Sequence, residues 1–161
     1  MSKILISGYY GFVNAGDEAM LTAIIESLRQ VEKNVELTVL SGNPEDTAAK
    51  HQVCSVYRFN PLGIIRAMKD SELIISGGGS LLQDVTSKRS LLYYLSIIGL
   101  GKFFGKKVML FAQGIGPIRA KWARKLTSLV CNEADLITVR DSESAAELIE
   151  MGVKPEKITV T

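Results

Sequence analysis

Four loops of this chain collect residues that can bind anions, move protons or hydrogen-bond a sugar. The first, residues 7–20, holds three glycines, Asn14 and an acid pair, Asp17 and Glu18. A carboxylate can orient or deprotonate a hydroxyl group. The same side chains also suit a helix start, where Asn caps the first turn and acids meet the positive end of the dipole. One cap needs one side chain, so the three together favour a binding role as well.

The next two loops offer backbone N–H groups. Residues 77–80 read GGGS, and consecutive glycines leave their amides open as a nest for phosphate or carboxylate, with Ser80 beside them. Residues 113–117 read QGIGP, whose glycines are equally typical of an ordinary tight turn. The GGGS loop is therefore the stronger prediction of an anion site.

The fourth loop, residues 140–144, begins with an arginine at the end of an apolar run. A charge there is costly unless it is paired, so Arg140 either forms an ion pair with Asp141 or Glu143, or presents its fork to a carboxylate or phosphate. We favour the fork. Arg58 is a weaker candidate of the same kind. His51 has no Cys or acidic cluster beside it, so we expect a solvated side chain and no metal site.

Alternating strand-like and helical segments must position these loops. Nearly all-apolar runs, typical of parallel strands covered on both faces, lie at 3–7, 35–41, 72–77, 107–113, 135–140 and 157–161, with a weaker run at 53–57. Helical patterns lie at 17–31, 61–69, 87–104, 118–133 and 142–151. The alternation predicts an α/β fold with a doubly wound, mostly parallel, Rossmann-like sheet. In such sheets ligands bind beyond the carboxyl ends of the strands, where all four loops lie.

Composition narrows the classes of function. The 161 residues, 47% of them hydrophobic, suit one globular domain, and a net charge of +2 without a basic stripe predicts no nucleic-acid partner. We expect Cys54 and Cys131 to be buried free thiols in a reducing cytoplasm. No signal peptide is visible, and the longest apolar run, residues 91–101, is shorter than the roughly 20 residues a transmembrane helix needs.

Motifs that the chain lacks exclude further classes of function. Glycines at 8, 11 and 16 do not match G-x-G-x-x-G, and the second strand-like run ends in LSGNPED rather than at an acid, which argues against a nicotinamide-dinucleotide site. The chain has neither the G-x-x-x-x-G-K-[ST] motif of P-loop proteins nor the G-x-S-x-G elbow of α/β-hydrolases.

The four loops together resemble the polysaccharide pyruvyl transferase family. The carrying segments are GYYGFVNAGDEAMLTAII at 8–25, ISGGGSLLQD at 75–84, FAQGIGP at 111–117 and TVRDSES at 138–144. The match is closest to bacterial members that pyruvylate secondary cell-wall polymer for surface-layer anchoring. The chain departs from the pattern at Val13, where members commonly have glycine.

The resemblance implies a cytoplasmic transferase with two Rossmann-like halves in a GT-B-like architecture. Phosphoenolpyruvate would be the donor, and a cyclic pyruvate ketal would form on a sugar of a lipid-linked precursor, without cofactor or metal. Residues 1–161 would be the N-terminal domain, inactive alone, with the C-terminal domain absent, which fits a chain that stops at Thr161 in a strand-like run. The family's catalytic histidine belongs to that absent half, so His51 does not inherit its role.

Roles follow for individual residues. Arg140 is expected to clamp the donor's carboxylate or phosphate, and Asp17 or Glu18 to orient or deprotonate a sugar hydroxyl, with Tyr10 as a stacking surface for the sugar ring. Asp17 and Arg140 are the expected catalytic residues. The expected substrate-binding residues are Tyr10, Gly11, Asn14, Gly16, Glu18, Gly78, Gly79, Ser80, Gln113, Gly114 and Asp141.

Three alternatives stay open at this point. One is a nucleotide-sugar glycosyltransferase of the same two-domain form. Another is a non-catalytic ligand-binding domain of flavodoxin-like form, although a response regulator would need an acidic pair after the first strand and a lysine after the fifth. The third concerns location: basic residues on helix 118–133 (Arg119, Lys121, Arg124 and Lys125) suit either a solvated face or contact with anionic lipid at the inner membrane face.

Overall fold

A single parallel sheet of seven strands runs through the computed structural model, which describes residues 2–161. Its strands, in chain order, are β1 (Lys3–Ser7), β2 (Glu36–Ser41), β3 (Cys54–Tyr57), β4 (Leu73–Gly77), β5 (Lys107–Gln113), β6 (Leu136–Val139) and β7 (Ile158–Val160). The helices are α1 (Ala15–Val31), α2 (Pro44–His51), α3 (Pro61–Asp70), α4 (Lys88–Phe103), α5 (Lys121–Glu133) and α6 (Ser142–Met151), with a 3-10 turn at Pro155–Lys157. The predicted α/β alternation is confirmed.

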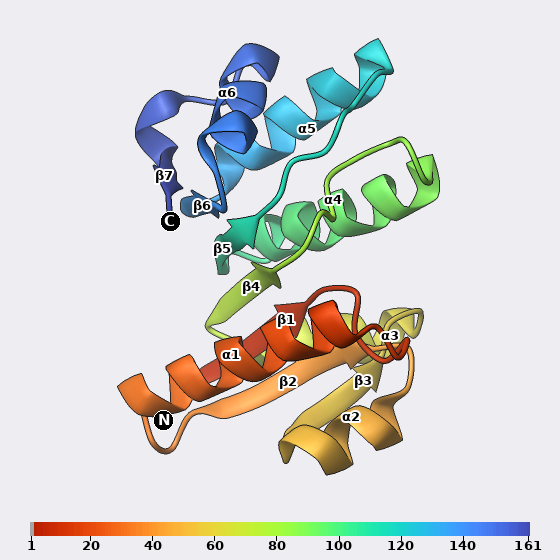
Figure 1. Ribbon diagram of the computed structural model, residues 1–161. Helices are drawn as coiled ribbons and strands as arrows, with labels where there is room; N and C mark the ends of the chain where they lie inside the picture. The colour runs from red at the N-terminus through yellow and green to blue at the C-terminus, as the bar shows by residue number, and fades with distance from the viewer. Residues whose placement is uncertain (1) are drawn as a thin grey trace.

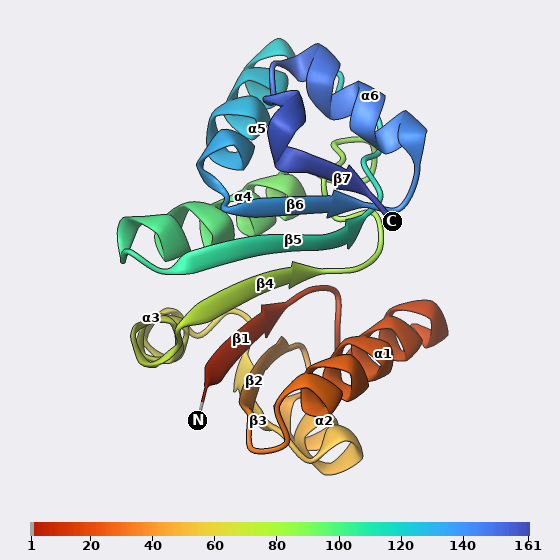
Figure 2. The ribbon, with the colours of Figure 1, turned by 90° about the vertical axis from the view of Figure 1, so that its left-hand side faces the viewer.

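The strand order is β3-β2-β1-β4-β5-β6-β7, so the chain reverses its direction of winding between β1 and β4. Figure 2 shows all the strand arrows pointing to one side, where the loops that follow them gather. Ligands of open parallel sheets bind beyond this edge, next to the reversal. The first loop follows β1 and the GGGS loop follows β4, so both flank the reversal point.

Two apolar clusters cover the two faces of the sheet. Alternate residues of β1 separate them, because Ile4 and Ile6 pack with helix α1 while Leu5 packs with α3 and α4. Figures 1 and 2 show α1 and α3 on opposite sides of the strands. Helices on both faces make the sheet doubly wound, as the all-apolar strands predicted.

Two helix predictions needed correction. Residues 44–51, where the sequence pattern predicted no helix, form α2. Asn43 caps its first turn by accepting from the Asp46 N–H at 3.3 Å, and Pro44 fixes the first helical φ. The helix expected at 118–133 begins only at Lys121. Before it, the Asp84 carboxylate accepts the N–H groups of Arg119 and Ala120 at 2.9–3.0 Å and holds that segment extended.

The two cysteines differ. Cys131 is buried, and burial raises the pKa of its thiol to about 12, so it remains a neutral core residue. Cys54 is exposed at the start of β3, which contradicts the expectation that both are buried. Across residues 2–161, none of the helices combines the length and the apolar character that crossing a bilayer requires.

Candidate active site at the carboxyl edge of the sheet

All four of the predicted loops meet beyond the strands. The Gly114 N–H donates to Gly79 O at 2.9 Å, which joins the loops after β5 and β4. A methyl group on Gly79 would lie 2.9 Å from Asp17 Oδ1, and one on Gly114 would overlap the Arg140 guanidinium. A carboxylate and an arginine therefore flank a strip of glycine backbone that has no side chains of its own.

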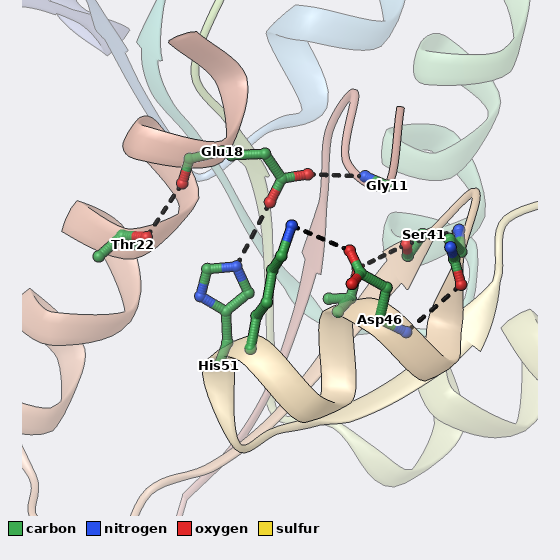
Figure 3. A network of polar contacts seen from close by, with 9 residues as sticks. Gly11, Glu18, Thr22, Ser41, Asp46 and His51 are labelled. Atoms are coloured by element: carbon green, nitrogen blue, oxygen red, sulfur yellow. Dashed lines mark hydrogen bonds and ion pairs between the residues drawn. The ribbon is translucent and has the colours of Figure 1, made fainter. Parts of the chain in front are cut away.

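The first loop is held by hydrogen bonds from α1. Asn14 accepts from the Asp17 N–H at 3.1 Å and caps the helix, which is the structural role the sequence allowed. Glu18 Oε1 accepts from the Gly11 N–H at 2.9 Å, and its Oε2 lies 3.4 Å from His51 Nε2, as Figure 3 shows. Glu18 therefore braces the loop, and Asp17 is the acid that faces the glycine strip.

His51 is not solvated, contrary to the expectation. It ends α2, and its side chain is only 10% exposed beside Glu18. Arg29 on α1 fixes the same turn, because its Nη2 donates to the carbonyls of His51 and Gln52 at 3.1 and 2.8 Å. The difference has a structural reason: His51 ends helix α2, and this helix places the side chain against Glu18 of α1.

The carboxyl group of Asp17 has a perturbed pKa. Partial burial and the neighbouring charge of Glu18 both raise the pKa of its carboxyl above the ordinary value. A carboxyl group with a raised pKa accepts a proton more readily than an exposed aspartate does, which suits a general base.

Tyr10 offers no stacking face to a sugar, which corrects the predicted role. Its ring is 1% exposed and lies against the backbone of Gly8 and Gly77, where a methyl group on either glycine would clash with it. The exposed aromatics of this loop are instead Tyr9 and Phe12, whose rings stack at 4.3 Å. The sequence did not distinguish the two adjacent tyrosines, because which ring turns inward depends on the fold of the loop.

The glycine loop is less open than its sequence suggested. Gly78 and Gly79 adopt φ of +48° and +76°, which favour glycine, and Ser80 is exposed beside them. The Gly78 N–H, however, donates to Phe111 O at 3.0 Å and is not available to a ligand.

Gln113 does not reach the site with its side chain, which is fully buried. Its Nε2 donates to Ser76 O at 2.8 Å, and its backbone carbonyl accepts from the Arg140 N–H at 3.1 Å. The predicted substrate contact is therefore replaced by a positioning role beneath Arg140.

Arg140 follows β6, which ends at Val139, and its side chain is 54% exposed. Its Nε lies 3.5 Å from Asp141 Oδ2, so the structural ion pair is present but weak, as exposed pairs are. Asp141 Oδ1 also caps α6 by accepting from the Ser144 N–H at 2.7 Å, and hydrogen bonds from Ser144 lower the pKa of the Asp141 carboxyl. The fork of Arg140 remains open to an anion.

The structure resembles less than half of each of several longer proteins of known structure. HepE of Anabaena in complex with UDP-glucose matches with a TM-score of 0.67 and 14% identity over 99% of this chain and 43% of its own. MnaA of S. aureus with UDP matches at 0.56 and 17%, over 100% and 44% of the two chains, and the galactosyltransferase WaaB at 0.56 and 14%, over 99% and 45%. This chain thus spans less than half of the structures it matches.

These likenesses establish the fold as a Rossmann-like half of the GT-B type. The search of curated proteins gave no match. The model of the family described as polysaccharide pyruvyl transferase matches residues 14–161, which include Asp17, the glycine strip and Arg140. The chain belongs to the polysaccharide pyruvyl transferase family.

Proposed function

We propose that this chain forms one half of the active site of a pyruvyl transferase that uses phosphoenolpyruvate to build a cyclic ketal on a sugar of a lipid-linked polysaccharide precursor. The observation that carries the proposal is the placement of Asp17 and Arg140 on either side of the Gly79–Gly114 backbone. Family membership supports a transferase that modifies polysaccharides. The donor and the ketal are the finer part of the proposal.

Arg140 is assigned to the donor. Phosphoenolpyruvate carries a carboxylate and a phosphate, and a guanidinium binds either group through two parallel hydrogen bonds. The absence of a side chain on Gly114 allows the Arg140 guanidinium to lie against the backbone, so a donor bound by this fork would lie beside the glycine strip. The open, half-exposed position of Arg140 supports this assignment.

The acid side is assigned to the acceptor. The oxygens of two sugar hydroxyls bond to C2 of the donor, and the bond between C2 and the phosphate oxygen breaks. Of the two hydroxyl protons, one ends on C3 and the other leaves with the phosphate. Asp17 would take the proton from one hydroxyl, since the pKa of its carboxyl is raised. Glu18 and Asn14 would hold the loop in place, and a general acid from a second half would protonate C3.

The second half is itself part of the proposal. We place it opposite this edge, because the structures that resemble this chain are more than twice its length. No metal or cofactor enters the proposed reaction. We also place the enzyme in the cytoplasm at the inner membrane face, with Lys121 and Lys125 of α5 exposed for anionic lipid, while Arg124 is bound to Glu147 at 2.8 Å.

A nucleotide-sugar glycosyltransferase is the second candidate, because the solved structures of HepE and MnaA contain UDP or UDP-glucose. Phosphate release separates the two reactions. The two-domain enzyme should release inorganic phosphate from phosphoenolpyruvate only when the glycan acceptor is present. Release of UDP from a UDP-sugar, with phosphoenolpyruvate left intact, would overturn the proposal in favour of the glycosyltransferase.

A further inference from the structure

A second arginine lies at the same edge of the sheet, and the site described above does not use it. Arg58 follows β3 and is only 5% exposed. Both backbone polar groups of Arg58 are hydrogen-bonded. Its N–H donates to Ser41 O at 3.0 Å, and its carbonyl accepts from the Tyr93 hydroxyl at 2.8 Å. The guanidinium is thus held inside the protein rather than extended into solvent.

Aromatic rings surround this guanidinium. Its carbon lies 4.5–5.9 Å from the centroids of five rings, contributed by the first loop, the loop after β3 and helix α4. The five are Tyr9, Phe12, Phe59, Tyr93 and Tyr94. Ring faces attract a cation, but they supply neither a negative charge nor an acceptor for each N–H group.

The charge of Arg58 has no counter-ion among residues 2–161. None of the ion pairs among these residues includes Arg58, and its buried Nε has no hydrogen-bond partner. The hydroxyl of Tyr94, one of the five rings, is also buried without a partner. Buried charges and polar groups are costly unless paired, so two neighbouring unsatisfied donors indicate that a partner is supplied from outside the chain.

The cover over Arg58 is thin. Tyr9 and Phe12 are 41% and 40% exposed, so they are the rings that face solvent, and both belong to the first loop. That loop is strained, because Val13 adopts φ of +57°, which a β-branched residue rarely does. Strain in the closed position lowers the cost of moving this loop aside.

We propose that Arg58 is an anion-binding residue that takes a phosphate or carboxylate group when the loop carrying Tyr9 and Phe12 moves aside. The ligand displaces no internal ion pair, so the full strength of the charged hydrogen bonds is available to it. The group comes either from the donor or from the diphosphate of a lipid-linked acceptor, and both present the same chemistry. The inference concerns binding alone and stands whether or not pyruvyl transfer is the reaction.

Thermal unfolding in phosphate tests the proposal. An Arg140→Met background removes the exposed arginine, and the unfolding midpoint is compared in phosphate and in sodium chloride at equal ionic strength. Phosphate should raise the midpoint of this background protein, because a ligand that binds only the folded state stabilises it. Adding Arg58→Met should abolish that rise, whereas adding Arg66→Met, at an exposed arginine on α3, should leave it intact.

An NMR titration of the unsubstituted chain needs no variant to fold. The Arg58 Nε–Hε resonance should move as inorganic phosphate is added. Repeating the titration with phosphoenolpyruvate and with a short-chain prenyl diphosphate sugar assigns the group to donor or acceptor by which binds more tightly. An unmoved Arg58 resonance, or an equal midpoint rise with and without Arg58→Met, would show that Arg58 only pins the aromatic rings together.

Discussion

The two sides of the glycine strip are built in opposite ways. On the acid side, Glu18 is bound to Gly11 and His51, and Asp17 sits partly buried with a raised carboxyl pKa. On the arginine side, Arg140 is half-exposed, its guanidinium lies against Gly114, and its one ion pair is with the neighbouring Asp141 at 3.5 Å. Glu18, next to Asp17, is therefore held by two contacts within the protein, whereas Arg140 has only a weak ion pair and is free to adjust to a ligand.

The difference fits the two substrates of the proposed reaction, which differ in character. A sugar hydroxyl needs a base held in one place, since proton transfer depends on a short and well-aligned hydrogen bond. An anionic donor can be captured by a flexible arginine that closes on it afterwards. Side chains that lie near each other at one edge of the sheet can therefore differ in rigidity, because they differ in their contacts with the rest of the protein.

Substitution of the glycines should separate the two sides most strongly. Gly8→Ala places a methyl group against the buried Tyr10 ring, which has no room to move, so we expect it to lower the free energy of unfolding by about 3 kcal/mol. The atoms nearest to a methyl group in Gly114→Ala are the end of the half-exposed Arg140 side chain, which can move, so this substitution should cost less than about 1 kcal/mol. Urea unfolding measures both, and equal losses would mean that the arginine side is as rigid as the acid side.

Arg140→Lys should cost activity without costing stability. Lysine keeps the charge but loses the fork, so pyruvyl transfer by the proposed two-domain enzyme should fall about thirtyfold. Because Arg140 is half-exposed, the free energy of unfolding should change by less than about 0.5 kcal/mol. Steady-state kinetics and urea unfolding test the pair, and activity at the wild-type level would remove Arg140 from the donor site.

Asp17→Asn should lower transfer by about tenfold, because the amide cannot accept the proton from the sugar hydroxyl. Turnover equal to that of the wild type would return Asp17 to a purely structural position in the first turn of α1.

The pH dependence of stability should differ in sign between the sides. The folded-state pKa of Asp17 is raised, so its charge opposes folding, and stability is lost as pH rises from 3.8 through that raised pKa. The pKa of Asp141 is lowered, so its contribution is present above 3.8 and lost as pH falls through the lowered pKa. Relative to wild type at pH 7, Asp17→Asn should gain stability and Asp141→Asn should lose it. Urea unfolding between pH 2 and pH 7 checks this, and slopes of the same sign would contradict the contrast.

The smallest effect is expected at His51. His51→Gln loses the contact with Glu18 while the Glu18–Gly11 hydrogen bond remains, so the free energy of unfolding should fall by only about 0.5 kcal/mol at pH 7. A loss several times larger would mean that α2 holds the first loop more firmly than Glu18 does. The matched substitution Lys50→Gln, which removes an exposed ion pair with Asp46, is the control.

The positions of the strands along the chain were predictable from the sequence, because apolar runs between turn residues carry their own signal. The grouping of Asp17, Gly79 and Arg140 at one edge followed from the rule that parallel strands end on the same side. The resemblance to the family also singled out Val13, at a position where glycine is common. Its φ of +57° is one that glycine adopts without strain.

The contacts that the sequence did not reveal join residues far apart in the chain. The Glu18–His51 contact spans 33 residues and depends on α2. This helix is short and its hydrophobic pattern is weak, so only Asn43 and Pro44 at its start indicate it in the sequence. The aromatic surroundings of Arg58 combine three separate segments, so no local spacing could have indicated them. Side-chain burial within a loop, as at Tyr10, is set by the whole fold.

The mass of the glycan product is the most direct test of whether the enzyme transfers a pyruvyl group from phosphoenolpyruvate. The two-domain enzyme would be supplied with a lipid-linked glycan, phosphoenolpyruvate and a UDP-sugar together, and the released glycan would be measured by mass spectrometry. The account predicts a mass increase of one pyruvate ketal, with loss of the two hydroxyl protons. An increase of one sugar unit, with no ketal, would contradict it.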